Sequence, residues 1–189
     1  MSDEVRLVER FVEKINSTAF TRERFFAKDL SPRLWFGDPD EAGDLGTVDW
    51  RIINSDESKR IETLEARLPF RLPRPFRSLV AGYAFPTIEL PSGMLFANTG
   101  EGHFHEFTDR VFRDKGLANV LLPAGYLQFG SPNTVEYDPI CFDTKRRNGH
   151  GDCPIVRIEH EGVLIHREIG VTEEIAPSFS ALLEKFLAA

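Results

Sequence analysis

Residues 126–165 read YLQFGSPNTVEYDPICFDTKRRNGHGDCPIVRIEHEGVLI, and they carry the clearest strand pattern of the chain. Four short runs rich in β-branched and aromatic residues lie at 126–129, 140–142, 155–159 and 163–165. Such runs, separated by turn-forming or polar segments, are typical of β-strands. Because the runs are short and closely spaced, we expect them to pair as an antiparallel sheet.

Outside this region the sequence predicts two further strands and several helices. Two more strands are predicted at 84–90 and 94–97, on either side of a turn at 91–93. Elsewhere, apolar residues recur every three or four positions, as in amphipathic helices. The predicted helices cover residues 3–15, 56–67, a segment beginning at 72–75, 104–115, which Gly116 would end, and a final segment from 177 to the C-terminus. The predicted fold class is therefore α+β, with helices packed around a central, mostly antiparallel sheet.

Length and charge limit the organisation of the chain and its partners. Its 189 residues fit one domain, with 56–189 as the core and 1–55 as an N-terminal extension of a helix and an acidic loop. The 30 acidic and 23 basic residues give a net charge of −7. This charge argues against binding to nucleic acid or to an anionic membrane surface. It suits a basic protein partner instead.

The N-terminus and the cysteines indicate a cellular compartment. Residues 1–6 contain no apolar signal core, and no run approaches the ~18 apolar residues of a membrane span. We therefore expect a cytoplasmic protein in which both cysteines stay reduced. The sequence leaves open whether it is a monomer or a weak dimer.

Motifs of known catalytic machinery are absent from the sequence. It contains no G-x-S-x-G, no P-loop, no G-x-G-x-x-G and no H-E-x-x-H. No serine or cysteine lies beside an obvious base. We predict that the chain is not an enzyme and that it uses no cofactor and no metal.

Metal-ligating residue types nevertheless leave a metal-dependent enzyme as one alternative. Cys141, His150 and Cys153 could supply a sulfur–nitrogen–sulfur set, with His160 as a fourth ligand. Their spacing fits no standard zinc finger. Cys141 also lies in a predicted strand, where a thiol packs as a small apolar group.

Two other groups could support enzymatic chemistry. His103 and His105 lie next to Glu106, and two histidines with a carboxylate can bind iron or zinc. Asp138 and Asp143 flank one predicted strand, but their odd separation places them on opposite faces of a regular strand. Acid–base work on one bond needs two carboxylates that converge on it.

Several segments resemble the signatures of a known family. The segments are IETLEARL at 61–68, LPRPFRSL at 72–79, GYLQFG at 125–130, YDPICFD at 137–143, CPIVRIEHE at 153–161 and EIAPSF at 174–179. They are similar to motifs of the SUKH superfamily, which contains Smi/Knr-like cell-wall-assembly regulators and bacterial toxin-immunity proteins. The resemblance covers about residues 56–189. It implies a compact α+β binding module with a central antiparallel sheet and no cofactor.

The resemblance implies an immunity protein that binds and neutralises a toxin domain, often a nuclease. An acidic inhibitor would associate rapidly with a basic substrate groove. The predicted partner-binding residues form an acidic loop beside a tryptophan that could anchor the partner. They are Trp35, Asp38, Asp40, Glu41 and Asp44. A second interpretation is a housekeeping regulator that acts as a scaffold for cellular partners.

Overall fold

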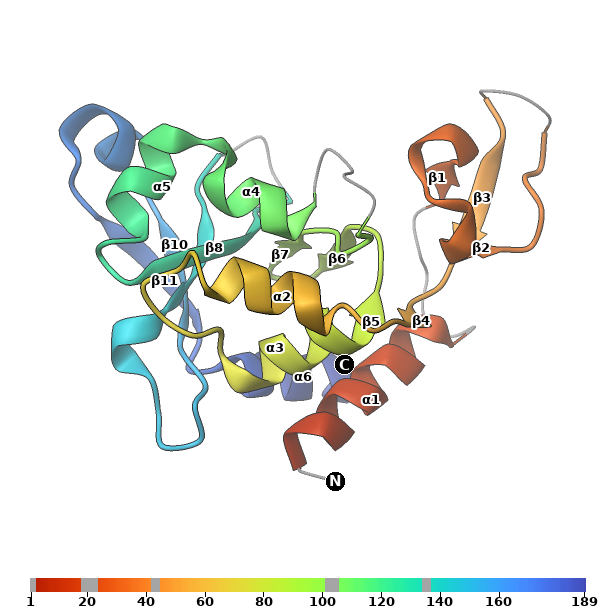
Figure 1. Ribbon diagram of the computed structural model, residues 1–189, viewed down its shortest axis with the longest axis horizontal. Coiled ribbons are helices and arrows are strands. Elements are labelled where there is room, and N and C mark those ends of the chain that lie inside the picture. The colour runs from red at the N-terminus through yellow and green to blue at the C-terminus, as the bar shows by residue number, and fades with distance from the viewer. Residues whose placement is uncertain (1–2, 18–23, 42–44, 101–105, 134–136) are drawn as a thin grey trace.

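The computed structural model describes residues 3–17, 24–41, 45–100, 106–133 and 137–189 (Figure 1). Its central feature is a six-stranded sheet with the order β11-β10-β9-β8-β7-β6, in which every neighbouring pair is antiparallel. The strands are β6 (Ile88–Leu90), β7 (Gly93–Leu95), β8 (Tyr126–Ser131), β9 (Ile140–Asp143), β10 (Ile155–Ile158) and β11 (Val171–Ala176).

The helices pack around this sheet, and the predicted α+β class is confirmed. They are α1 (Asp3–Asn16), α2 (Ser58–Glu65), α3 (Arg74–Gly82), α4 (Phe107–Arg113), α5 (Lys115–Leu121) and α6 (Phe179–Ala188). Short helical turns lie at η1 (Ala27–Asp29), η2 (Pro32–Leu34), η3 (Thr144–Arg146) and η4 (Gly162–His166). Within the described residues, no helix combines the length and the apolar character that crossing a membrane requires.

The strand register divides the core into two clusters. Leu127, Phe142 and Ile155 are opposite one another on β8, β9 and β10, so their side chains share one face. That face packs against helices that include α3 and α6, and the ring centroids of Phe76 and Phe142 are 5.0 Å apart. The neighbouring residues of the strands point the other way, toward α5 and η4.

Residues 163–165 do not form the predicted fourth strand. They belong to η4, a π-helical turn in which Val163 is buried while Leu164 and Ile165 are exposed. The strand next to β10 is instead β11. Its mostly exposed residues, several of them polar, give no apolar run, and this is why the sequence pattern did not reveal it.

Over its described residues, the segment predicted as one helix at 104–115 belongs to two helices; residues 104 and 105 lie outside the described residues. Asp114 separates α4 from α5, and its carboxylate accepts a hydrogen bond from the Leu117 N–H at 3.1 Å. This side chain caps the first turn of α5. Gly116, which was predicted to end the helix, therefore lies inside the second one.

The N-terminal region contributes a helix to the core and a second sheet beside it. On α1, the ring of Phe11 lies 5.3 Å from that of Phe186 on α6. The second sheet has the order β1-β3-β2, with β1 (Phe25–Phe26), β3 (Thr47–Trp50) and β2 (Trp35–Phe36). A two-stranded pair, β4 (Ile53–Asn54) and β5 (Tyr83–Ala84), connects this region to α3. Figure 1 shows the three-stranded sheet projecting to one side of the molecule.

Candidate functional site

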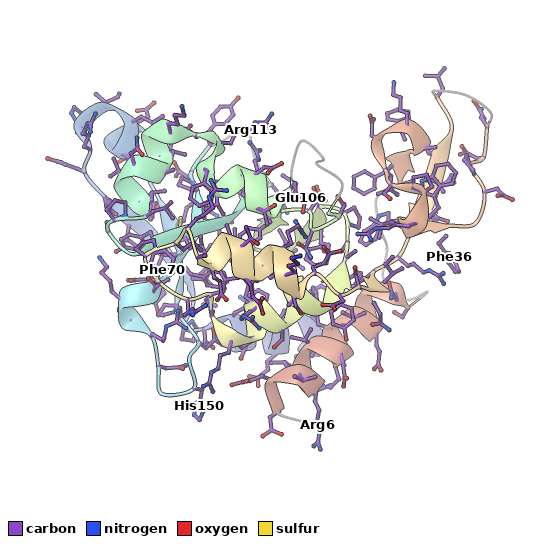
Figure 2. All side chains as sticks on the ribbon, viewed as in Figure 1. Arg6, Phe36, Phe70, Glu106, Arg113 and His150 are labelled. Carbon is purple, nitrogen blue, oxygen red and sulfur yellow. The ribbon has the colours of Figure 1, made fainter. Side chains whose placement is uncertain are left out.

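The three-stranded sheet exposes two phenylalanines on one face. Phe26 lies opposite Thr47, and Phe36 lies opposite Asp49, so these four side chains point to the same side. Phe26 is 46% exposed and Phe36 is 54% exposed. We call the surface formed by Phe26, Phe36, Thr47 and Asp49 the outer face. Figure 2 labels Phe36 at this projecting part of the molecule.

The opposite side of the same sheet packs into the core. Val48 and Trp50 are buried, and the Phe25 ring lies 6.2 Å from that of Trp50 in an edge-to-face arrangement. Trp35 is partly buried against this cluster. Its indole N–H donates a hydrogen bond to the Leu30 carbonyl at 3.1 Å. The predicted anchor is therefore directed inward, and its polar group is already paired within the chain.

The acidic loop is attached to the outer face through Asp40. Its carboxylate accepts hydrogen bonds from the backbone N–H and the hydroxyl of Thr47, at 2.7 and 2.9 Å. Arg24 bridges this carboxylate to Asp49, with N–O distances of 2.7 and 3.2 Å. The hydrogen bonds from Thr47, together with the charge of Arg24, lower the pKa of Asp40, so the group stays ionised.

The predicted partner-binding residues thus have different environments. Asp38 and Glu41 are exposed, and Asp40 is exposed but holds the loop against β3. Trp35 packs inward, and Asp44 lies outside the described residues. Carboxylates at 38, 40, 41 and 49 consequently lie on or next to a surface with two exposed aromatic rings.

Cations also border the two rings. The Lys28 ammonium lies 5.9 Å from the ring centroid of Phe26, and the Arg51 guanidinium lies 5.8 Å from that of Phe36. Both distances are within the range of cation–π attraction. These contacts hold the rings in place without burying them, so the rings remain available to a partner.

Sequence reasoning missed Phe26 and Phe36, and the sequence carries only a partial signal for them. The chain contains two aromatic pairs, Phe25-Phe26 and Trp35-Phe36. Successive residues of a strand point to opposite faces, so each pair on a half-buried sheet must direct one ring outward. The two short strands were not predicted, and the rule was therefore not applied to them.

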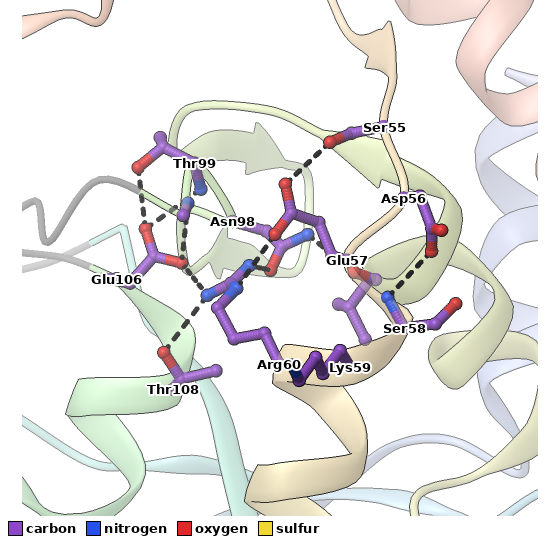
Figure 3. Close-up of polar contacts among 12 residues, drawn as sticks. Ser55, Asp56, Glu57, Ser58, Lys59, Arg60, Asn98, Thr99, Glu106 and Thr108 are labelled. Carbon is purple, nitrogen blue, oxygen red and sulfur yellow. Dashed lines mark hydrogen bonds and ion pairs between the residues drawn. The ribbon is translucent and has the colours of Figure 1, made fainter.

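A second polar cluster lies beside the N-terminus of α2 (Figure 3). Arg60 donates hydrogen bonds to Glu106 and Asn98, and its Nε lies 3.1 Å from a Glu57 carboxylate oxygen. Glu106 is buried and also accepts from the backbone N–H and hydroxyl of Thr99, at 2.9 and 2.8 Å. The cluster ties α2 to the segment before α4.

The electrostatics of this cluster favour the charged state of Glu57. Partial burial opposes ionisation, but hydrogen bonds from Ser55 and Arg33 and the charge of Arg60 together lower its pKa. Glu106, the carboxylate of the predicted histidine site, is already committed to Arg60 and Thr99. His103 and His105 lie outside the described residues.

The structure does not bring the predicted sulfur ligands together. Cys141 packs in the cluster on the α5 side of the sheet, and Cys153 packs in the cluster on the opposite side. Burial raises the pKa of both thiols, that of Cys153 to about 11, which disfavours the thiolate that binds metals. His150 is exposed. Among the residues with described positions, no three metal-ligating side chains form a group that could hold an ion.

The two predicted carboxylates are each engaged in local contacts. Asp138 accepts a hydrogen bond from the backbone N–H of His160 at 3.0 Å and lies 2.9 Å from its Nδ1. Asp143 is buried and binds the guanidinium of Arg146 at 2.8 Å. Both carboxylates therefore stabilise chain segments that adjoin β9.

Comparisons with known proteins add no assignment, because no protein-family model and no curated protein sequence matches this chain.

Proposed function

We propose that this chain is a non-enzymatic protein-binding module of the immunity type, which binds a toxin domain, often a nuclease, and blocks it. The observation that carries the proposal is the outer face, where Phe26 and Phe36 are exposed beside Asp49 and the carboxylates of the acidic loop. Aromatic side chains are frequent anchors of protein interfaces.

Electrostatics supports a basic partner. The net charge of the chain is −7, and the exposed carboxylates of Asp38 and Glu41 lie in the loop beside the projecting sheet, where Arg24 pairs with Asp40 and Asp49. A nuclease domain presents cations where it binds phosphates. Complementary charge would accelerate association, and raising the salt concentration should slow it.

The remaining chemistry of the chain is consistent with a binding role. Catalytic motifs are absent from the sequence, and the buried carboxylates Glu65, Glu106, Asp143 and Asp152 are all engaged in contacts within the fold. Most apolar residues of the SUKH-like motifs lie in the two core clusters, whereas Tyr137 is exposed. Their role in this proposal is structural, and recognition is assigned to the outer face.

The test is affinity purification of the tagged chain from its native cells, compared with Phe26→Ser/Phe36→Ser. The matched control is Ile165→Ser, which removes a 68% exposed apolar side chain from η4. We expect a basic protein to co-elute with the wild type and the control. Its affinity for the double variant should fall roughly 30-fold, because two rings lose buried contact area.

The co-eluting protein also separates the two interpretations. Inhibition of a nuclease or other toxic activity by the purified chain supports the immunity proposal. A cell-envelope partner whose activity the chain does not inhibit supports the scaffold-type regulator. A partner that binds the double variant as tightly as the wild type removes the outer face from the binding site.

A further inference from the structure

One extended segment, residues 47–54, carries the projecting three-stranded sheet on the body of the fold. Its first part is β3, which pairs with β1 and β2 of that sheet, and its last part is β4, which pairs with β5 directly after α3. Residues 51 and 52 lie between these two strands and belong to neither. The segment therefore changes partners at this point, where a small rotation of the backbone would move the whole outer face.

Asn16, the last residue of α1, bonds both backbone groups of Ile52. Its side-chain N–H donates to the Ile52 carbonyl at 2.8 Å, and its side-chain oxygen accepts from the Ile52 N–H at 2.8 Å. Two opposed residues of an antiparallel ladder exchange the same pair of hydrogen bonds. The planar amide of Asn16 thus takes the place of a neighbouring strand where the segment changes partners. Figure 1 shows β4 beside this end of α1.

The helix that carries this amide is itself fixed to the core. Phe11 packs edge-to-face against Phe186 on α6, with ring centroids 5.3 Å apart. The Lys14 ammonium donates to the carbonyls of Phe186 and Leu187 near the end of α6, at 2.9 and 3.3 Å. Asn16 therefore connects the projecting sheet to a helix that the core holds in place.

Other contacts also hold the sheet on the body, and they define what one amide can contribute. Leu34 and Trp50 pack in the core cluster, and Arg33 pairs with Glu57 at 3.2 Å. These contacts keep the sheet attached without Asn16. Apolar packing is non-directional, however, whereas two hydrogen bonds between one planar amide and one residue fix distance and angle together. Loss of the amide should therefore change the orientation of the sheet and not its attachment.

We infer that Asn16 is the positioning residue of the outer face. Phe26 and Phe36 lie on β1 and β2, which both pair with β3, so the direction of the segment sets the direction of the two rings. A surface held in its binding orientation loses less conformational entropy when a partner binds, and the complex is tighter. This consequence for affinity rests on the proposed function, whereas the positioning itself can be measured without a partner.

The test measures the distance between the projecting sheet and α6 by double electron–electron resonance in the full chain. Nitroxide labels are attached at Asp29→Cys, on η1, and at Glu184→Cys, on α6, because both native residues are exposed. Cys141 and Cys153 are buried, and burial raises the pKa of both thiols, so neither should react with the label at neutral pH. Treating the chain without added cysteines with the same label checks this.

The test variant is Asn16→Ala, and the matched control is Ser17→Ala. Ser17 lies at the same end of α1, where its N–H and its hydroxyl both donate to the Lys14 carbonyl, at 3.2 and 2.7 Å. We expect one narrow distance for the wild type and the control, and a distribution at least about twice as wide for Asn16→Ala. Asn16→Asp should also widen it, because a carboxylate cannot donate to the Ile52 carbonyl. A partner captured through the outer face should bind Asn16→Ala about tenfold more weakly.

Three results would overturn the inference. They are an unchanged distribution in Asn16→Ala, equal widening by Ser17→Ala, and unchanged partner affinity despite a wider distribution. If circular dichroism shows that Asn16→Ala does not fold, Asn16→Asp must give the wider distribution, and the inference is wrong if neither variant folds. The proposed function fails by a different result, equal affinity of the partner for the wild type and Phe26→Ser/Phe36→Ser, so the two failures are distinguishable.

Discussion

Glu62 and Glu65 are one turn apart on α2, but the fold uses them differently. The Glu65 side chain is 1% exposed, accepts from the Leu72 N–H at 2.9 Å and pairs with Arg77 at 3.1 Å. Glu62 is 65% exposed and lies 3.9 Å from the same guanidinium. A buried carboxylate that satisfies both a backbone donor and a cation is costly to remove, whereas an exposed ion pair contributes little.

We therefore predict opposite outcomes for the same substitution at these two positions. Glu65→Gln should lower the free energy of unfolding by about 2 kcal/mol. The side-chain amide of glutamine has only one oxygen, so it cannot accept hydrogen bonds from Leu72 and Arg77 through two separate oxygens. Glu62→Gln should change the free energy of unfolding by less than about 0.5 kcal/mol. Urea denaturation of both variants and the wild type measures the difference. Equal destabilisation by the two changes would contradict this account.

At the scale of elements, the loop before β10 holds the N-terminus of α6. The buried carboxylate of Asp152 accepts hydrogen bonds from the backbone N–H groups of Phe179 and Ser180, at 3.1 and 2.9 Å. Ser178 caps the same end by accepting from the Ala181 N–H at 3.0 Å. A negative charge at a helix N-terminus is also favoured by the helix dipole. One side chain thus fixes α6 relative to the central sheet.

Removing this contact should weaken the docking of the whole helix. Asp152→Ala is expected to lower the free energy of unfolding by about 2 kcal/mol, and Ser178→Ala by about 1 kcal/mol, because each leaves N–H donors of the first turn unpaired. Thermal and urea unfolding measure both changes. Glu184→Ala, on the exposed side of α6, is the control and should stay near wild type. The explanation fails if Asp152→Ala is no more harmful than this control.

At the scale of the whole molecule, the two thiols report on global unfolding. They are buried in clusters on opposite faces of one sheet, so exposing both thiols requires the β9–β10 region to separate from the layers that cover both faces. The unfolded chain releases thiol protons near pH 9.0, whereas Cys153 in the folded chain does so only near pH 11. The folded state therefore binds more protons than the unfolded state across this interval.

Stability should consequently fall as the pH rises between 9 and 11. The contribution of the neutral Cys153 thiol is present in full below pH 9 and is lost toward pH 11, about 3 kcal/mol in all. Urea denaturation at several pH values between 9 and 11 measures how steeply the free energy of unfolding falls with pH, for the wild type and for Cys153→Ala. Burial raises the pKa of Cys141 and of Tyr83 as well, so the variant keeps part of the slope. Identical slopes for the two proteins would contradict the assignment to Cys153.

The strands and helices with strong apolar periodicity could be predicted from the sequence. Strands β8, β9 and β10 were found because each is rich in aromatic, β-branched or other apolar residues, and α1 because its buried residues form one stripe. Edge strand β11 was missed because its first four residues are exposed and three of its six residues are polar, so it contains no apolar run. The π-helical turn η4 was misread because Val163, Leu164 and Ile165 have strand-like propensity.

The candidate site was only partly accessible to the same reasoning. Local composition located an acidic loop, and it also identified Trp35 as the aromatic residue next to it. Whether Trp35 or Phe36 faces solvent depends on the pairing of β2 with β3 and on which side of that sheet meets the core. Neither fact is contained in the residues around position 35.

Fold class, net charge and the absence of catalytic motifs could all be read along the chain, because they depend on composition and on periodicity over neighbouring residues. The exposure of Phe26 and Phe36, the separation of the thiols and the bonding of Asn16 to Ile52 emerged only after folding. These features arise from contacts between segments distant in sequence. Burial and hydrogen-bond pairing are properties of such contacts, and no local pattern encodes them.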